Sequence, residues 1–174
     1  MAHAPTTIVD LDRLTLTHGE GRRLDIPVRL DPLELGGQVY VAVPESVKTR
    51  LDISRPSGGF AFRMRFPVRI EGPCMRCLEP AVLEADVDAR EVDHHNTDDQ
   101  ELRSPYVVEG ELDIGRWAHD AAVLATPTRL LCRPDCAGLC PVCGVSLNDA
   151  DPADHEHESG IDPRWEKLKD LKID

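Results

Sequence analysis

The sequence predicts an α+β fold that is mainly antiparallel β, a small barrel or sandwich with one packed helix and a cysteine-rich knuckle near the C-terminus. Three observations lead to this fold class. Val- and Ile-rich runs alternate with turn residues at the start of the chain, one later stretch carries apolar side chains at helical spacing, and four cysteines fall close together. At 174 residues, the chain is long enough for one domain with a hydrophobic core and some appended segments.

Five strands are expected at the start of the chain, where runs rich in Val and Ile are bounded by Gly, Pro and Ser. They span residues 24–30, 38–43, 47–53, 60–70 and 82–92. Their spacing indicates an antiparallel meander. The turn between the last two strands carries Cys74 and Cys77, so a hairpin end would present both side chains together.

One helix is expected to begin after Asp113, a suitable N-cap, and to end near residue 125, because Pro127 stops it. Apolar side chains recur there at three- and four-residue intervals. They are Ile114, Trp117, Ala121 and Leu124. This stripe should pack on the open face of the sheet.

The rest of the chain divides by composition. Residues 93–105 are polar and acidic and are expected to form a solvated loop. We expect a β-rich domain over residues 1–130 that includes the helix at about 113–125, and a cysteine-rich knuckle over residues 131–148. Residues 149–174 are expected to be an acidic tail with a short amphipathic helix.

The formal charge of −12 argues against a protein that coats nucleic acid through bulk electrostatics. The charge is uneven, since residues 1–80 carry a net +1 and residues 81–174 a net −13. The first residues have no basic or apolar leader character, and no apolar run approaches the roughly 20 residues that span a bilayer. We therefore expect a cytosolic protein with no membrane partner.

Four cysteines lie in the stretch Cys132-Arg-Pro-Asp-Cys136-Ala-Gly-Leu-Cys140-Pro-Val-Cys143. A tetrahedral Zn²⁺ ion takes four thiolates at about 2.3 Å, and cysteines this close in sequence can turn inward together on tight loops. The spacing predicts a structural zinc site with Cys132, Cys136, Cys140 and Cys143 as ligands. Disulfides are the alternative, which is disfavoured because nothing in the sequence indicates an oxidising compartment.

A second pair, Cys74 and Cys77, leaves another ligand set open. These two cysteines can combine with two of the downstream cysteines as facing knuckles of a zinc ribbon, which would tie the middle of the chain to its end. A thiol redox centre is less favoured, because Pro80 and a strand follow where redox proteins place a helix. The histidines of the acidic segments are expected to be solvated rather than metal-bound. These are His94, His95, His155 and His157.

Strand alternation over residues 60–70 predicts one apolar face and one cationic face. The cationic face carries Arg63, Arg65 and Arg69, and Arg76 on the following hairpin extends it. Guanidinium groups suit phosphates, so these arginines are candidates for RNA contact. The alternative is a solvated face whose arginines pair with acids of the strand expected at residues 82–92.

An enzyme is not expected. The sequence contains no Gly-rich phosphate loop, no Gly-x-Ser-x-Gly elbow and no His-Glu-x-x-His motif. A zinc ion with four thiolates also has no open position for water. We therefore expect a binding protein without a small-molecule substrate. A zinc-ribbon adaptor that binds only protein and a Cys-x-x-Cys thiol-redox protein remain as alternatives.

Three stretches carry a family resemblance: Cys74-Met-Arg-Cys-Leu-Glu-Pro80, Asp135-Cys-Ala-Gly-Leu-Cys-Pro-Val-Cys-Gly144 with Leu147-Asn148, and Ile161-Asp-Pro-Arg164 through Leu168. With the order of the other features, they resemble the YceD family of large-ribosomal-subunit RNA accumulation proteins. The resemblance implies a bacterial, cytoplasmic, non-enzymatic factor that supports synthesis, processing or accumulation of 23S rRNA. It implies 23S rRNA or precursor large-subunit (pre-50S) particles as partners, and the acidic second half suggests a basic ribosomal protein as another.

Overall fold

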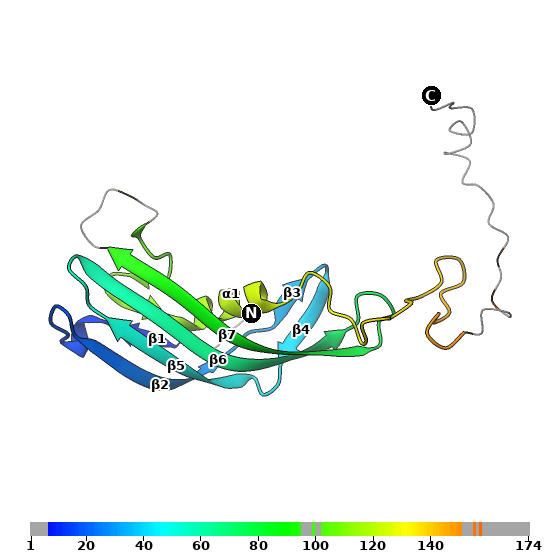
Figure 1. The fold of residues 1–174 in the computed structure, drawn as a ribbon, viewed down its shortest axis with the longest axis horizontal. Coiled ribbons are helices and arrows are strands. Elements are labelled where there is room, and N and C mark those ends of the chain that lie inside the picture. Colours follow the sequence, from blue (N-terminus) through cyan, green and yellow to red (C-terminus); the bar gives the residue numbers. More distant parts are fainter. Residues whose placement is uncertain (1–6, 95–98, 100–101, 151–154, 156, 158–174) are drawn as a thin grey trace, which may run out of the picture.

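A computed structural model describes residues 7–94, 99, 102–150, 155 and 157. Within these residues the fold is mainly antiparallel β with one α-helix, as the sequence predicts (Figure 1). The larger sheet consists of β2 (Gly21–Arg29), β3 (Leu33–Leu35), β4 (Gln38–Ala42), β5 (Ser46–Ser54), β6 (Gly59–Pro73) and β7 (Pro80–His94). The smaller sheet consists of β1 (Ile8–Asp10), β8 (Val107–Val108) and β9 (Glu111–Asp113).

Two helical segments accompany the sheets. A single 3-10 turn, η1 (Asp12–Leu14), follows β1, and the helix α1 (Ile114–Ala125) follows β9 directly. The side chain of Asp113 accepts a hydrogen bond from the backbone N–H of Arg116 at 2.9 Å, so Asp113 is the N-cap that the sequence predicts. The helix ends at the predicted position before Pro127.

Strand β6 is the centre of the larger sheet. β7 pairs with β6 along its whole length, from Gly59 opposite His94 to Pro73 opposite Pro80. On the other edge of β6, β5 pairs with the first half and β4 with the second half. Figure 1 shows the long β6–β7 hairpin running along the curved sheet, with its turn beside the segment that follows α1.

The strand order differs from the predicted meander. β2 pairs with β5 over its full length, starting with Gly21 opposite Ser54. β3 and β4 form a separate hairpin whose turn contains Gly36 and Gly37, both with positive φ (58° and 78°). β4 pairs with β6 on its other edge, so β2 pairs with β5 and not with β4, and the order becomes β2, β5, β6, β4, β3, with β7 paired to the remaining edge of β6.

The core lies between the larger sheet and α1. Alternation along β6 buries Phe62, Met64 and Phe66, as predicted, and turns the intervening arginines outward. Trp117 of α1 is buried and meets Phe62 edge-on, with 6.3 Å between the ring centroids. The helix therefore closes the apolar face of the sheet.

The predicted helix stripe is wrong at Leu124, which is 86% exposed. The other three members are buried, but Ala118 and Ala122 are buried with them. These small residues allow the helix to approach the sheet closely on their side. The buried stripe is therefore rotated toward the alanines, and Leu124 falls outside it.

Part of the predicted C-terminal organisation lies outside the described residues. This applies to the short helix expected in the tail and to much of the acidic segment after residue 150. None of the helices formed by the described residues has the length and apolar character that a membrane crossing requires.

Candidate metal centre and arginine face

The turn of the β6–β7 hairpin is a tight loop that begins at Cys74. The backbone N–H of Cys74 donates to the carbonyl of Glu79 at 2.7 Å, and the N–H of Leu78 donates to the carbonyl of Cys74 at 3.0 Å. The N–H of Arg76 points at the Cys74 sulfur, with 3.4 Å between N and Sγ. The loop closes through Leu78, whose φ is 63°. This geometry turns Cys74 and Cys77 inward, and both are buried.

The segment after α1 docks onto this turn. The backbone N–H of Met75 donates to the carbonyl of Leu130 at 2.9 Å, and the Arg76 guanidinium donates to the carbonyl of Cys136 at 2.7 Å. Gly138 has a φ of 85°, and a Cβ there would lie 3.3 Å from the Arg76 carbonyl oxygen. These contacts bring Cys136 to the hairpin turn from 62 residues further along the chain.

Four cysteine sulfurs meet where the turn and this segment join. They belong to Cys74, Cys77, Cys132 and Cys136, and all lie within 4.8 Å of one another. The Sγ atoms of Cys74 and Cys136 are 3.8 Å apart, and those of Cys77 and Cys132 are 3.5 Å apart. Four sulfurs around a tetrahedral ion with bonds of about 2.3 Å lie about 3.8 Å from one another. The cluster therefore has the size that a tetrahedral metal ion requires.

The sulfurs of this four-cysteine cluster differ in electrostatics. Burial disfavours the Cys74 thiolate, yet the backbone amides around it outweigh burial and lower the pKa of the Cys74 thiol to about 6. Burial and the sulfurs of Cys77 and Cys136 raise the pKa of Cys132 to about 12. One thiolate, at Cys74, is thus already favoured by the turn, whereas a thiolate at Cys132 would be stabilised by a positive ion in the site.

The predicted local ligand set is divided between two places in the structure. Cys132 and Cys136 lie with the hairpin pair, which is the arrangement of the alternative ligand set. Cys140 and Cys143 lie in a separate group with His155 and His157, in which the four ligand atoms are also within 4.8 Å of one another. The Cys143 Sγ is 4.0 Å from Nε2 of His155.

Electrostatics also favour a thiolate in this second group. The backbone amides of Cys143 and Val142 outweigh partial burial and lower the pKa of Cys140 to about 6. Cys140 is buried, whereas Cys143 is exposed. The second group therefore lies closer to solvent than the four-cysteine cluster.

Each arginine predicted for the outer face of β6 is paired with a carboxylate. Arg63 pairs with Asp88, and Arg65 pairs with Asp52. Arg69 pairs with both Glu71 and Glu84, at 2.8 and 2.9 Å. Arg63 and Arg69 thus pair with acids of β7, as in the alternative of a salt-bridged face, whereas Arg65 pairs with Asp52 of β5. Arg76 lies apart from this face, with its guanidinium hydrogen-bonded to the Cys136 carbonyl at the four-cysteine cluster.

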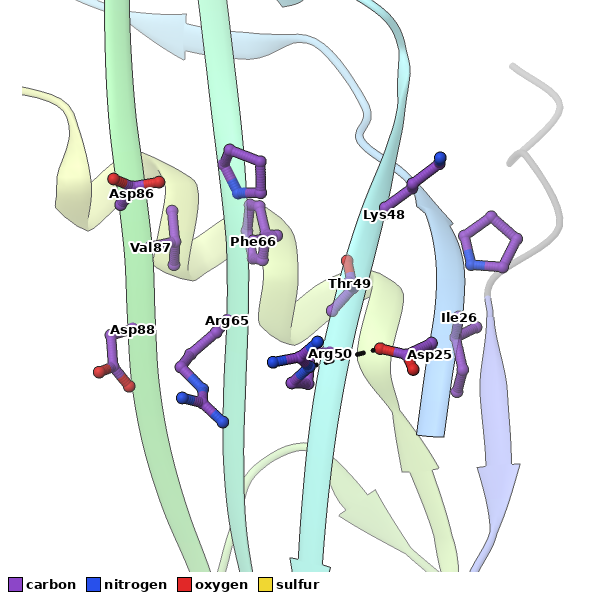
Figure 2. Close-up of a pocket in the computed structure, with 12 residues that line it drawn as sticks. Asp25, Ile26, Lys48, Thr49, Arg50, Arg65, Phe66, Asp86, Val87 and Asp88 are labelled. Atoms are coloured by element: carbon purple, nitrogen blue, oxygen red, sulfur yellow. Dashed lines mark hydrogen bonds and ion pairs between the residues drawn. The ribbon is translucent and has the colours of Figure 1, made fainter. Parts of the chain in front are cut away.

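A pocket crosses the same face at the level of Arg65 and spans β2, β5, β6 and β7 (Figure 2). Its lining carries charges of both signs, with the cations on the two central strands, β5 and β6, and the anions on the two outer strands, β2 and β7. The cations are Lys48, Arg50 and Arg65, and the anions are Asp25, Asp86 and Asp88. Arg50 is 3.5 Å from Asp25, as the dashed line in Figure 2 marks. A surface that mixes charges in this way lacks the positive character of a phosphate-binding groove.

Sequence reasoning missed two features of the cluster region. His155 and His157 were expected to be solvated, because their acidic neighbours give no ligand pattern. Asn148 donates from Nδ2 toward the Cys136 sulfur at 3.6 Å and accepts from the N–H of Ala137 at 2.8 Å. Its place five residues after Cys143, within the stretch that carries the family resemblance, is a sequence signal for a role near the cysteines.

A further missed feature is an apolar groove beside the hairpin turn. It is formed by outward-facing residues of β4, β6 and β7 and by the turn itself. The apolar side chains that line it include Val39, Val41, Pro73, Leu78, Pro80 and Val82. Sequence alternation does not reveal it, because the strand β4 carries valines on the face that is polar elsewhere.

Three mycobacterial proteins are similar to part of this chain. An uncharacterized protein of Mycobacterium bovis and one of Mycobacterium tuberculosis are each 38% identical to this chain over 107 residues, which are 58% of the chain and 49% of the relative. An uncharacterized protein of Mycobacterium leprae is 42% identical over 66 residues, 38% of the chain and 29% of the relative. The chain spans about half the length of the first two. No solved structure matches it.

Residues 62–172 match the family described as "Large ribosomal RNA subunit accumulation protein YceD". The matched region begins in β6 and contains the hairpin turn, α1 and all six cysteines. Because the match covers more than half of the chain, the protein belongs to the YceD family of large ribosomal RNA subunit accumulation proteins.

Proposed function

We propose that this protein is a non-enzymatic factor in the biogenesis of the large ribosomal subunit, which supports 23S rRNA synthesis, processing or accumulation by binding the rRNA or a ribosomal protein. The observation that carries the proposal is the family match over residues 62–172. The family description links the chain to large-subunit RNA. Such a factor would act in the cytoplasm, where bacterial ribosomes assemble.

Zinc is the ion that best fits the four-cysteine cluster. Zinc accepts four thiolates in a tetrahedral arrangement, and the sulfur separations of 3.5 and 3.8 Å suit it. An ion held by four protein thiolates has no open position for water or substrate. The proposed role of the ion is therefore structural: it would join the hairpin turn to the segment after α1.

Burial argues against a thiol-redox function. Thiol exchange requires a thiolate that a partner molecule can reach. Cys74 and Cys77 are both buried beneath the segment that follows α1. The backbone amides that lower the pKa of Cys74 favour the thiolate, which is the form that a metal ion binds.

A protein partner is better supported than direct RNA contact by the outer face of the sheet. A phosphate that approaches an arginine paired with a carboxylate also meets the negative charge of that carboxylate, which weakens phosphate binding. Residues 81–174 also carry a net charge of −13, which repels an RNA backbone and attracts a basic protein. We therefore favour a basic ribosomal protein as the direct partner.

The apolar groove beside the hairpin turn is the surface that we assign to this partner. Leu78 is 58% exposed and Val39 is 54% exposed, and Val41 and Val82 lie beside them in the groove. Contiguous exposed apolar patches mark protein interaction sites. Glu79 is exposed in the adjacent turn and adds the negative charge that suits a basic partner.

The test is co-sedimentation of the tagged full-length protein with ribosomal particles from its own cells, at low and moderate salt, with the bound RNA and proteins identified. We expect enrichment on immature large subunits. After ribonuclease digestion, which dismantles the particles, affinity capture through the tag should still recover a directly bound basic ribosomal protein, whereas a contact made through RNA should be lost. Recovery only with a non-ribosomal complex, or with nothing, would overturn the proposed function in favour of an adaptor without a link to RNA.

A further inference from the structure

We propose that Cys140, Cys143, His155 and His157 form a second metal site, which binds a divalent ion of the zinc class independently of the four-cysteine cluster. This site is additional to the structural zinc of the proposed function. Its four ligand atoms lie within 4.8 Å of one another, and none of them belongs to the first cluster. Each of the two groups supplies the four ligands that a tetrahedral ion needs.

The two Cys-x-x-Cys turns, at Cys74 and at Cys140, have the same backbone hydrogen bonds. At Cys140, the N–H of Val142 points at the sulfur with 3.4 Å between N and Sγ, and the N–H of Gly144 donates to the Cys140 carbonyl at 2.9 Å. The N–H of Cys140 donates to the carbonyl of Val145 at 2.8 Å. At Cys74 the equivalent three distances are 3.4, 3.0 and 2.7 Å.

The two turns also share a left-handed residue at the same position. Gly144, four residues after Cys140, has a φ of 75°, and Leu78, four residues after Cys74, has a φ of 63°. A non-glycine residue adopts this conformation only at a cost, so the turn at Leu78 is held by its surroundings. In both turns the amide that points at the first sulfur stabilises a thiolate. The backbone at Cys140 is therefore already arranged as half of a metal site.

The two histidines complete the second site. Nε2 of His155 is 4.0 Å from the Cys143 sulfur, and the ring of His157 stands perpendicular to that of His155 with 4.7 Å between the centroids. A sulfur and a nitrogen bound to one tetrahedral zinc lie about 3.6 Å apart. A small inward movement of His155 would close the site. One nitrogen of each ring lies within 4.8 Å of the other ligand atoms, so both imidazoles can reach a single ion.

The ligand set identifies the class of ion. Two thiolates and two imidazoles favour zinc over magnesium or calcium, which prefer oxygen ligands. Cys143 and His157 are exposed, whereas three of the four cysteines in the first cluster are buried. The second ion should therefore exchange faster than the first.

The test is the zinc content of the purified full-length protein, measured by mass spectrometry of the metal, together with its release to a chromophoric chelator. We expect two ions per chain, released in a fast and a slow phase of equal amplitude. The double variant His155→Asn/His157→Asn should bind one ion and lose only the fast phase. The matched control His18→Asn/His119→Asn changes histidines outside both clusters and should keep two ions.

Cobalt substitution gives a measurement that does not depend on counting. The difference spectrum between cobalt-loaded wild-type protein and the His155→Asn/His157→Asn variant should contain the bands of a site with two thiolates and two imidazoles. One ion per chain in the wild-type protein, or two ions retained by that variant, would overturn the second site. Neither result bears on co-sedimentation with ribosomal particles, so failure of this inference is distinguishable from failure of the proposed function.

Discussion

Gly72 shows how a single residue without a side chain shapes the sheet at its cysteine-bearing end. The ring of Tyr40 packs directly on the backbone of β6 there, and a Cβ on Gly72 would lie 2.2 Å from Tyr40 Cδ1. Tyr40 is fully buried and its hydroxyl donates to the carbonyl of Pro73 at 3.1 Å, so the ring has little freedom to move. We expect Gly72→Ala to lower the free energy of unfolding by about 1–3 kcal/mol, as measured by chemical denaturation.

The same substitution in a protein that lacks the Tyr40 ring tests whether the contact with that ring causes the loss of stability. In a Tyr40→Leu protein, which has lost the ring, Gly72→Ala should cost much less than in the wild-type background. An equal cost in both backgrounds would show that the Tyr40 contact is not the cause.

The ion pairs of Asp52 with Arg23 and Arg65 make the free energy of unfolding depend on pH. Hydrogen bonds from Arg23 and then Arg65 outweigh partial burial and hold the pKa of Asp52 below its usual value. The unfolded chain, in which this pKa is about 3.9, therefore binds the proton more readily than the folded protein. The stabilisation is present above that pH and is lost as the pH falls through the lower, folded-state pKa.

The measurable consequence is the slope of stability on the acid side. We expect the free energy of unfolding to decrease less steeply below about pH 4 in Asp52→Asn than in the wild-type protein. Asp86→Asn is the matched control, because Asp86 lies on the same face and forms no ion pair with any described residue. A wild-type slope in Asp52→Asn would contradict the assignment.

At the level of elements, the sequence predicts long strands well and their pairing poorly. Alternation places β5, β6 and β7 within a few residues of their observed bounds. β1, β3, β8 and β9 have two or three residues each, which is too short for a period of two to be recognised. β2 pairs with β5 because the β3–β4 hairpin between them joins the sheet elsewhere, beside β6. No local sequence pattern predicts this long-range arrangement.

The candidate metal centre was likewise predictable in its local features and not in its long-range contacts. Spacing identifies which cysteines can form tight turns, because that property is local. It does not determine which turns meet, since the first cluster depends on contacts such as Arg76 to the carbonyl of Cys136, 60 residues apart. His155 and His157 are missed for a related reason. A histidine can be a metal ligand only where the fold brings it close to other ligands, here Cys140 and Cys143, and the local sequence does not predict that approach.

Removal of the first metal should loosen one end of the molecule and leave the other intact. Zinc contributes roughly 10–16 kcal/mol of apparent folding free energy in zinc-finger peptides, so the elements that share the ion depend on it. With a chelator, hydrogen exchange of the full-length protein should accelerate in residues 74–79 and 130–148. The paired strands β2 and β5 should keep their protection, because they lie away from the cluster.

The matched control for this experiment is Cys143→Ser, which changes a ligand of the second group alone. Its turn at residues 74–79 should stay protected until chelator is added. An equal loss of protection in all strands of the larger sheet would contradict the local role of the first metal and indicate that the ion supports the whole fold.

On the scale of the whole molecule, the apolar groove adjoins one end of the salt-bridged face, since Glu71, a partner of Arg69, also lines the groove. The outer face of β6 is balanced in charge by its neighbours, whereas the apolar groove lies at the end of the sheet that carries the four-cysteine cluster. A metal at that cluster would hold the turn and its exposed Leu78 in one position. The ion would then keep the apolar groove in the shape that binds the partner, although the ion itself would not contact the partner.

This arrangement predicts that the groove, and not apolar exposure in general, determines association with ribosomal particles. Leu78→Asn keeps a residue that tolerates the left-handed conformation, and Val82→Ser keeps a strand residue, so the double variant should fold normally. We expect its co-sedimentation with immature large subunits to fall at least tenfold, because central apolar contacts dominate most interfaces. Val108→Ser is the matched control, since Val108 is 66% exposed in the smaller sheet. Equal losses in the double variant and in Val108→Ser, or undiminished association of the double variant, would show that the groove does not bind the partner. The paired arginines of the sheet face would then be the next candidate contact surface.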